Sequence, residues 1–202
     1  MEKSQQRSIL FAGDSVTDCG RREDPRKLGD GYVNVIAAEV AQRGIAVSNV
    51  GIGGDRVVDL QRRWAGDVLG SSANVLSILV GINDTWRRFD SNEPTTAEAF
   101  EQGYRELLTQ AAPHFELIVL VQPFLLPVTE DQQDWAQDLQ DKQDAVARLA
   151  AEFGAALVPA HERLTALAPH HGGNAALAHD GVHPTSLGHA ELANIWLAAV
   201  NV

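Results

Sequence analysis

The sequence contains a single cysteine among its 202 residues, and this scarcity excludes two kinds of cross-link. One thiol cannot form an internal disulfide, and it cannot supply the several thiolates of a structural zinc site. This use of cysteine fits a reducing compartment, so we expect a cytoplasmic protein. Cys19 itself could be a nucleophile, although a lone thiol is more often a small buried side chain.

Basic residues and long apolar runs are also lacking. The chain carries 16 Lys and Arg residues against 27 Asp and Glu residues, which gives a formal net charge of -11. Nucleic-acid binding depends on cations that neutralise phosphates, so we do not expect a nucleic-acid partner. No apolar run is long enough to span a bilayer, and Met1 to Arg7 carry no apolar leader. We therefore expect a soluble protein without a membrane partner.

The pattern that is present is an alternation of short apolar runs with amphipathic stretches. The length suits one domain over residues 1–202. Alternating strands and helices imply right-handed βαβ units, so we expect an α/β protein in which a five-stranded parallel sheet lies between two helical layers. The expected strands cover 8–12, 45–50, 75–80, 117–121 and 155–158. The expected helices cover 32–43, 57–68, 95–112, 132–153, 161–168 and 186–200, and 16–31, 81–94 and 169–184 are expected to be loops.

Polar, glycine-containing turns follow the first three expected strands: Gly13-Asp14-Ser15, Gly51-Ile52-Gly53-Gly54-Asp55 and Gly81-Ile82-Asn83-Asp84. Because the carboxyl ends of parallel strands share one edge of the sheet, these turns are expected to converge. Each turn alone is also typical of an ordinary capped turn. A phosphate cradle is a further interpretation of the glycines, but no Gly-x-Gly-x-x-Gly or Walker pattern follows a strand.

Asp180 and His183 complete a set of residues suited to acyl transfer. Such chemistry needs a nucleophile, a base with an orienting acid, and donors for the oxyanion. The spacing of three residues lets the Asp180 carboxylate meet Nδ1 of His183 while Nε2 faces outward. The backbone N–H groups of Ser15 and Gly54 and the amide of Asn83 are the candidate donors. The alternative for Asp180 and His183 is an incidental ion pair in an exposed loop.

In this order, the motifs Gly13-Asp14-Ser15, Gly54, Gly81-x-Asn83-Asp84 and Asp180-x-x-His183 resemble those of the SGNH, or GDSL, hydrolase family over essentially the whole chain. The resemblance implies a flavodoxin-like three-layer α/β/α sandwich and a serine hydrolase without metal or cofactor. It also implies that Ser15 is the nucleophile and first oxyanion donor, that Gly54 and Asn83 are the other donors, and that His183 and Asp180 complete a catalytic triad. Val16 stands where the GDSL name has Leu, at a position that packs and does not react.

Segments 16–21, 28–33, 81–87 and 180–184 are similar to intracellular xylan acetylesterases within that family. This likeness implies a serine esterase that removes acetyl or other short acyl groups from a carbohydrate such as a xylo-oligosaccharide. His179 departs from that branch, whose members can carry an aromatic residue before the catalytic Asp. The alternatives are a short-chain carboxylesterase, thioesterase or lysophospholipase-like enzyme without sugar preference, and a non-catalytic carbohydrate-binding module.

Trp86 and Arg87 follow the Asn83 turn, where an aromatic ring beside a cation suits the wall of a substrate pocket. We place Asp14 and His179 with them as candidate substrate-binding residues, and we also expect Asp14 to brace its turn through side-chain to backbone hydrogen bonds. The other tryptophans, Trp64, Trp135 and Trp196, fall on apolar helix faces, where they would pack in the core or at a contact in a homo-oligomer. The remaining histidines with no ligand spacing, His161, His170, His171 and His189, are expected at the surface or at helix caps.

Overall fold

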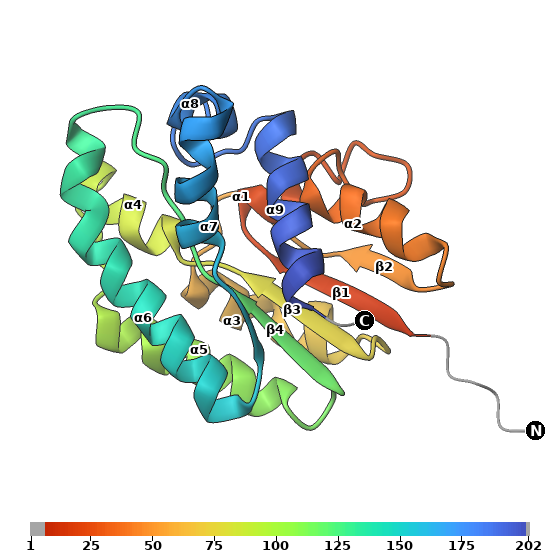
Figure 1. Cartoon of the computed structure of the whole chain (residues 1–202). Helices are drawn as coiled ribbons and strands as arrows, with labels where there is room; N and C mark the ends of the chain where they lie inside the picture. Colours follow the sequence, from red (N-terminus) through yellow and green to blue (C-terminus); the bar gives the residue numbers. More distant parts are fainter. Residues whose placement is uncertain (1–6, 201–202) are drawn as a thin grey trace, which may run out of the picture.

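Five parallel strands form the centre of the computed structural model, which describes residues 7–200. The strands lie side by side in the order β2-β1-β3-β4-β5 (Figure 1). This arrangement confirms the predicted five-stranded parallel sheet. The strand bounds are β1 Ser8–Gly13, β2 Ala46–Asn49, β3 Val75–Leu79, β4 Leu117–Val121 and β5 Ala156–Val158.

Two layers of helices cover the sheet, as Figure 1 shows. One layer contains α2 (Tyr32–Ala41), α7 (Ala160–Leu167) and α9 (Ser186–Ala199). The opposite layer contains α3 (Val57–Trp64), α5 (Ala97–Ala111) and α6 (Ala136–Phe153). The expected three-layer α/β/α sandwich is therefore confirmed.

The side chains of β1 explain why this strand is an unbroken apolar run. Successive side chains of a strand point to opposite faces, and here both faces are covered. Ile9 and Phe11 pack in the core beneath α2 and α9, whereas Leu10 and Ala12 pack against α3 and α5. On the first face, Trp196 lies 5.4 Å from the Phe11 ring. Trp64, Trp135 and Trp196 are all buried, as expected for tryptophans that pack in the core.

The strand order places the ends of β1 and β3 next to each other, with Gly13 paired to Leu79. The chain leaves β1 and β3 toward opposite edges of the sheet, and open α/β sheets bind ligands at such a switch point. Ser15 and Asn83 lie directly beyond these two strand ends. The topology thus brings the first and third polar turns to one place.

Several short helices occupy segments that were expected to be loops. The main correction is α4 (Ile82–Asp90), which replaces most of the loop predicted for 81–94. Ile82, Trp86 and Phe89 have helical spacing, but charged residues between them hide the pattern, and the helix is stabilised by packing against Trp135. The other additions in expected loops are α1 (Ser15–Asp18), the 3₁₀ helix η3 (Ala168–His171) and α8 (Asn174–Leu177). The π-helix η1 (Ala65–Leu69) and the 3₁₀ helix η2 (Asp131–Trp135) fall at the ends of the helices expected over 57–68 and 132–153.

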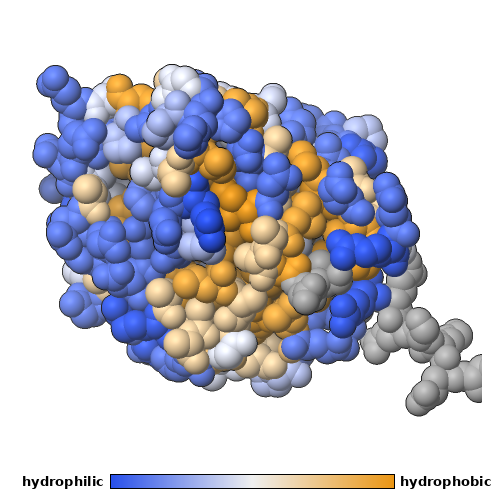
Figure 2. All heavy atoms as spheres, viewed as in Figure 1, coloured by the Kyte–Doolittle hydropathy of each residue, from blue (hydrophilic) through white to orange (hydrophobic). Residues whose placement is uncertain are grey.

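Within residues 7–200, no helix combines the length and the apolar character that crossing a membrane requires. Met1 to Gln6, for which the sequence predicts no apolar leader, lie outside the described residues. Apolar side chains gather across the middle of the face that carries α9 (Figure 2).

Candidate active site

Ser15 lies at the point where β1 turns into α1. A Cβ on Gly13 would come within 2.2 Å of the Leu79 carbonyl oxygen and 2.5 Å of Thr17 Oγ1, so only glycine allows this close exit from the strand. Ser15 is the first residue of α1 and is partly accessible. A backbone N–H at this position has no acceptor within its own helix. Both the hydroxyl and the amide of Ser15 can therefore face a ligand.

His183 approaches Ser15 from the far end of the chain. Its Nε2 lies 2.9 Å from Ser15 Oγ, although 168 residues separate the two in sequence. Its Nδ1 lies 2.6 Å from Asp180 Oδ2. With the ring proton on Nδ1, facing the carboxylate, Nε2 accepts a hydrogen bond from the Ser15 hydroxyl. This geometry allows His183 to take the hydroxyl proton when Ser15 attacks a carbon atom.

The Asp180 carboxylate is held by its own loop. Its Oδ1 accepts hydrogen bonds from the backbone N–H groups of Val182, over 2.9 Å, and His183, over 2.7 Å. Burial alone would raise the pKa of Asp180, but the hydrogen bonds from the His183 ring and from both backbone N–H groups outweigh it and lower the pKa below its ordinary value. The carboxylate is therefore charged at neutral pH and can stabilise a protonated His183.

Gln132 anchors this loop to the rest of the protein. Its buried amide donates from Nε2 to the Asp180 carbonyl oxygen over 2.8 Å and accepts from the Val128 N–H, also over 2.8 Å. Gly181 has a φ of +85°, and a Cβ there would lie 2.7 Å from Gln132 Oε1. Leu126 N–H donates to the Gly181 carbonyl over 2.8 Å. Sequence reasoning missed Gln132, because a glutamine among polar residues carries no signal of burial.

The Gly53–Gly54 turn lies beside Ser15. A Cβ built on Gly53 would be 3.9 Å from Ser15 Cβ, and the Gly53 N–H donates to Asp18 Oδ2 over 3.0 Å. Gly53 and Gly54 are exposed, so their backbone is accessible to a ligand. The structure thus places the second polar turn next to the first.

The Asn83 side chain joins the third turn to the second. Its Nδ2 donates to the Asp55 carbonyl oxygen over 3.1 Å. A primary amide has a second N–H, which this contact leaves available. Asn83 is buried in the first turn of α4, so its amide has a fixed direction. Ser15, the Gly53–Gly54 turn and Asn83 therefore lie at the carboxyl ends of neighbouring strands, where their N–H groups are candidates to receive a developing oxyanion.

The Asp14 side chain is not accessible to a substrate, which corrects its prediction as a substrate-binding residue. Its side chain is fully buried, and Oδ1 accepts the Val16 N–H over 3.0 Å. Burial raises the pKa of Asp14 to about 7, and the nearby carboxylates of Asp84 and Asp55 add to the rise. Asp84 is also buried, with a pKa that burial raises to about 7, and its Oδ2 accepts the Val57 N–H over 3.2 Å. Both carboxyl groups brace turns beneath the site.

An aromatic wall borders His183. The Trp86 ring is half-buried, and its centroid lies 6.0 Å from the His183 ring and 5.6 Å from the Trp135 ring. The Arg87 guanidinium lies 5.5 Å from the Trp86 centroid and forms an ion pair with Asp90. Of the predicted substrate-binding residues, Trp86 thus borders His183, and Arg87 lies against the Trp86 ring.

His179, the other predicted substrate-binding residue, is exposed and directly precedes Asp180. Asp180, the next residue, contacts the His183 ring. The ring of His179 itself is open to solvent.

His189 and Cys19 form a separate contact. The prediction that His189 is a surface or cap residue is wrong, because its ring is buried and accepts the Tyr32 N–H at Nδ1 over 3.2 Å. Its Nε2 lies 3.3 Å from Cys19 Sγ, and the thiol donates to Asp30 Oδ1 over 3.1 Å. Burial, with help from Asp30, raises the pKa of Cys19 to about 12. Cys19 is therefore a protonated thiol at neutral pH, unlike a nucleophilic cysteine.

The model of the GDSL-like lipase/acylhydrolase family matches residues 11–191. The chain belongs to this family. It is 34% identical to an acetylxylan esterase of Geobacillus stearothermophilus over 95% of this chain and 93% of that protein.

Solved structures support the same assignment. The crystal structure of Axe2, an acetylxylan esterase from Geobacillus stearothermophilus, matches with a TM-score of 0.89 and 31% identity over 100% of this chain and 97% of that chain. A catalytic mutant of Axe2 with alanine in place of a serine matches with a TM-score of 0.88 and 31% identity, over 98% of this chain and 96% of that chain. This GDSL hydrolase is accordingly a serine esterase with the SGNH hydrolase fold.

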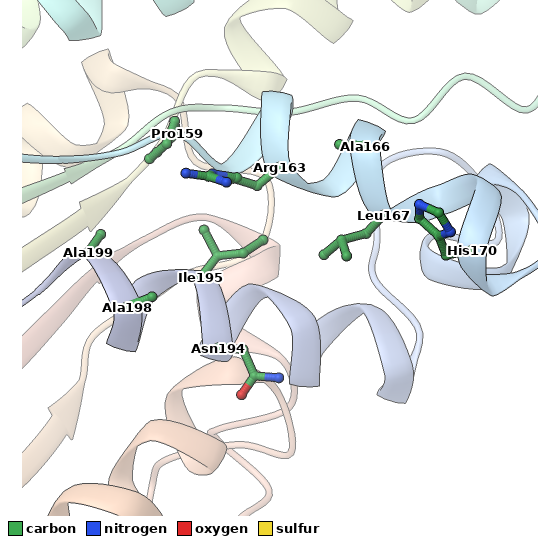
Figure 3. Close-up of a pocket in the computed structure, with 9 residues that line it drawn as sticks. All are labelled: Pro159, Arg163, Ala166, Leu167, His170, Asn194, Ile195, Ala198 and Ala199. Atoms are coloured by element: carbon green, nitrogen blue, oxygen red, sulfur yellow. The ribbon is translucent and has the colours of Figure 1, made fainter.

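A cavity of about 530 Å³ lies away from these residues, between α7 and α9 (Figure 3). Arg163 and Leu167 of α7 and Ile195 of α9 line it. None of the predicted site residues contributes to its wall. In this GDSL hydrolase, the groove is distinct from the Ser15 site.

Proposed function

We propose that this GDSL hydrolase removes acetyl or other short acyl groups from carbohydrate esters through a Ser15-His183-Asp180 triad and an acyl-enzyme. The observation that carries the proposal is the contact chain from Ser15 Oγ to His183 Nε2, at 2.9 Å, and from His183 Nδ1 to Asp180 Oδ2, at 2.6 Å. A nucleophile, a base and an orienting carboxylate in this order are the elements that ester hydrolysis by serine requires.

In the acylation step, Ser15 Oγ forms a bond to the ester carbonyl carbon as His183 Nε2 accepts the hydroxyl proton. The carbonyl oxygen becomes an oxyanion, which the N–H groups of Ser15, Gly54 and Asn83 face. Collapse of this intermediate breaks the bond to the alcohol oxygen, and protonated His183 gives its proton to the departing alcohol. The charged Asp180 stabilises His183 while it carries that proton.

In the deacylation step, a water molecule attacks the acyl group on Ser15 and gives a proton to His183. The second tetrahedral intermediate uses the same three donors. Its collapse returns the proton from His183 to Ser15 Oγ and releases the carboxylic acid. Ser15 and His183 return to their starting protonation states, so each cycle consumes only one ester and one water molecule.

Two observations support a sugar as the alcohol part of the ester. The Trp86 ring is half-buried beside His183 and presents an aromatic surface for a sugar ring, while Arg87 and His179 offer hydrogen bonds to hydroxyl groups. The similarity to an acetylxylan esterase over 95% of the chain favours the same substrate class.

A second candidate function is a short-chain carboxylesterase or thioesterase without sugar preference. The wall formed by Trp86 and Trp135 is largely apolar, and it would also accept an apolar alcohol. Rates of acetate release from acetylated xylo-oligosaccharides, compared with p-nitrophenyl acetate, butyrate and octanoate, separate the two functions. Faster turnover of the sugar esters supports the first, and equal or slower turnover supports the second.

The esterase mechanism is tested by Ser15→Ala, with acetate release measured on the purified protein. Loss of the nucleophile is expected to reduce kcat by about 10³-fold or more. Ser186→Ala is the matched control, because Ser186 is an exposed serine at the start of α9. Unchanged hydrolysis by Ser15→Ala would show that the proposed mechanism is wrong.

A further inference from the structure

Arg63 is a partly buried cation directly behind the converging turns. It lies near the end of α3, and its side chain is only 15% exposed. Its guanidinium donates from Nε to Asp55 Oδ2 over 2.7 Å and from Nη2 to the Gly13 carbonyl oxygen over 3.2 Å. Its Nη1 donates to the Val50 carbonyl oxygen over 2.6 Å and to Asp67 Oδ2 over 2.9 Å.

Two of these acceptors belong to the strand ends that carry the site. The Gly13 carbonyl lies two residues before Ser15, and it also accepts the Ile52 N–H over 3.0 Å. The Val50 carbonyl opens the turn that leads to Gly54. Arg63 therefore fixes the first turn relative to the second through backbone atoms.

Asp55 connects Arg63 to the third turn, which carries Asn83. Its carboxylate is 11% exposed and binds Arg63, and its carbonyl oxygen accepts Asn83 Nδ2 over 3.1 Å. A change in the position of Asp55 would therefore turn the Asn83 amide as well as the Gly54 peptide. One guanidinium thus connects, directly or through Asp55, the three groups that face the oxyanion.

We propose that Arg63, acting through Asp55, is a positioning residue that sets the relative placement of the oxyanion donors Ser15, Gly54 and Asn83. This inference rests on the proposed function, because it assigns a role within that same site. The hydrogen bonds of Arg63 go to Asp55, Asp67 and two backbone carbonyls, so we expect it to act on the reaction by positioning other groups.

The chemistry of the guanidinium fits this role better than a role in stability alone. A buried ion pair is often no more stabilising than apolar side chains of similar size. The planar guanidinium of an arginine, in contrast, holds several hydrogen-bond acceptors at fixed angles, and a lysine ammonium cannot do this. The oxyanion donors need such precision, because small displacements of groups around a reacting centre cost large factors in rate.

The test compares Arg63→Lys with Arg62→Lys, a matched control on the same helix. Arg62 is 70% exposed, and within residues 7–200 its only ion pair is with Asp59. Hydrolysis of p-nitrophenyl acetate is measured, and each rate is divided by the number of sites that a fluorophosphonate labels. We expect the kcat of Arg63→Lys to fall about 10- to 100-fold with KM within about twofold, and Arg62→Lys to match the wild type within about twofold.

A double-variant experiment shows whether the loss passes through the oxyanion donors. If Arg63 positions Asn83, Arg63→Lys combined with Asn83→Ala should lose at least about fivefold less activity than the product of the two single losses. An exact product would contradict the coupling. A normal kcat per labelled site in Arg63→Lys, even with a lower melting temperature, would overturn the proposal and leave Arg63 a purely structural residue.

If Arg63→Lys yields no folded protein, Asp55→Asn provides the second test. It keeps the backbone carbonyl that binds Asn83 and removes only the charge that holds Arg63, so we expect about a 3- to 10-fold lower kcat with KM unchanged. An unchanged kcat in Asp55→Asn would overturn the proposal. Failure of the proposed function would be recognised separately, as full activity in Ser15→Ala.

Discussion

Ser15 and His183 meet across 2.9 Å, yet different parts of the fold hold them in place. Ser15 sits on a turn between neighbouring strands, where Gly13 packs against the Leu79 carbonyl and binds Arg63. His183 sits in a loop closed by the Ala178–Pro184 bridge, and its side chain is 38% exposed. The serine half thus depends on the sheet, whereas the histidine half depends on hydrogen bonds within its own loop and on the anchor that Gln132 provides.

This difference shows that the proposed oxyanion donors and the Asp180–His183 contact need different kinds of structural support. The proposed oxyanion donors come from three separate turns, so only tertiary packing can fix their relative positions. The Asp180–His183 contact spans three residues, and hydrogen bonds from the loop's own backbone hold the carboxylate. We therefore expect substitutions in the serine half to affect stability more strongly than substitutions in the histidine loop.

The largest expected effect comes from His183→Ala, which removes the contact between the two halves. Without a base, Ser15 cannot lose its proton, and kcat should fall by about 10³-fold or more. The half-exposed side chain makes few core contacts, so the melting temperature should change by less than about 3 °C. Steady-state kinetics and thermal unfolding measure the two quantities. A large loss of stability would contradict the assignment of His183 to a locally supported half.

Asn83→Ala tests the serine half with the next largest effect. Removal of one oxyanion donor should lower kcat by about 10²–10³-fold with little change in KM. Because Asn83 is buried and its amide binds the Asp55 carbonyl, the variant should also be less stable, by about 1–2 kcal/mol. Asn194→Ala, at an exposed position in α9, is the control. A normal kcat in a destabilised Asn83→Ala protein would restrict Asn83 to a structural role.

Gln132→Leu tests the support of the histidine loop. The substitution leaves the Asp180 carbonyl and the Val128 N–H without their partner, so the loop should shift and kcat should fall about 10-fold. Gln133→Leu, at the exposed neighbouring position, should have nearly wild-type kinetics. Equal kinetics in the two variants would mean that the loop holds Asp180 and His183 without Gln132.

Asp14→Asn tests the buried carboxyl group beneath Ser15 and has the smallest expected effect. The folded protein holds the pKa of Asp14 at about 7, above the ordinary value of 3.8, so it binds more protons than the unfolded chain between these values. The stability from this group is complete below about pH 4 and is lost as the pH rises through 7. Asparagine does not titrate, so the variant should melt roughly 5 °C above the wild type at pH 8 and show a smaller advantage at pH 5.

Thermal unfolding at both pH values measures this difference, with Asp134→Asn as an exposed control. A melting-temperature difference that does not depend on pH would show that Asp14 is ionised in the folded protein throughout this range.

The layered fold could be predicted because strands buried on both faces, such as β1, are unbroken apolar runs. The contact between Asp180 and His183 was also predictable, since a spacing of three residues lets the carboxylate meet the imidazole, but the same spacing fits an incidental ion pair in a loop. The helix α4 was missed because its stability comes from tertiary contacts with Trp135, which no local pattern reveals. Arg63 and Gln132 were missed for a related reason: only the folded structure shows which polar side chains are buried against backbone acceptors.

The proposed mechanism depends on Ser15 as the nucleophile and on His183 as the base that activates it. The most direct measurement is mass spectrometry of the protein after reaction with a fluorophosphonate, combined with peptide mapping. We expect one adduct per chain, located on Ser15, formed far more slowly in His183→Ala and absent in Ser15→Ala. An adduct on a different residue, or equally rapid labelling of Ser15 without His183, would contradict the proposed mechanism.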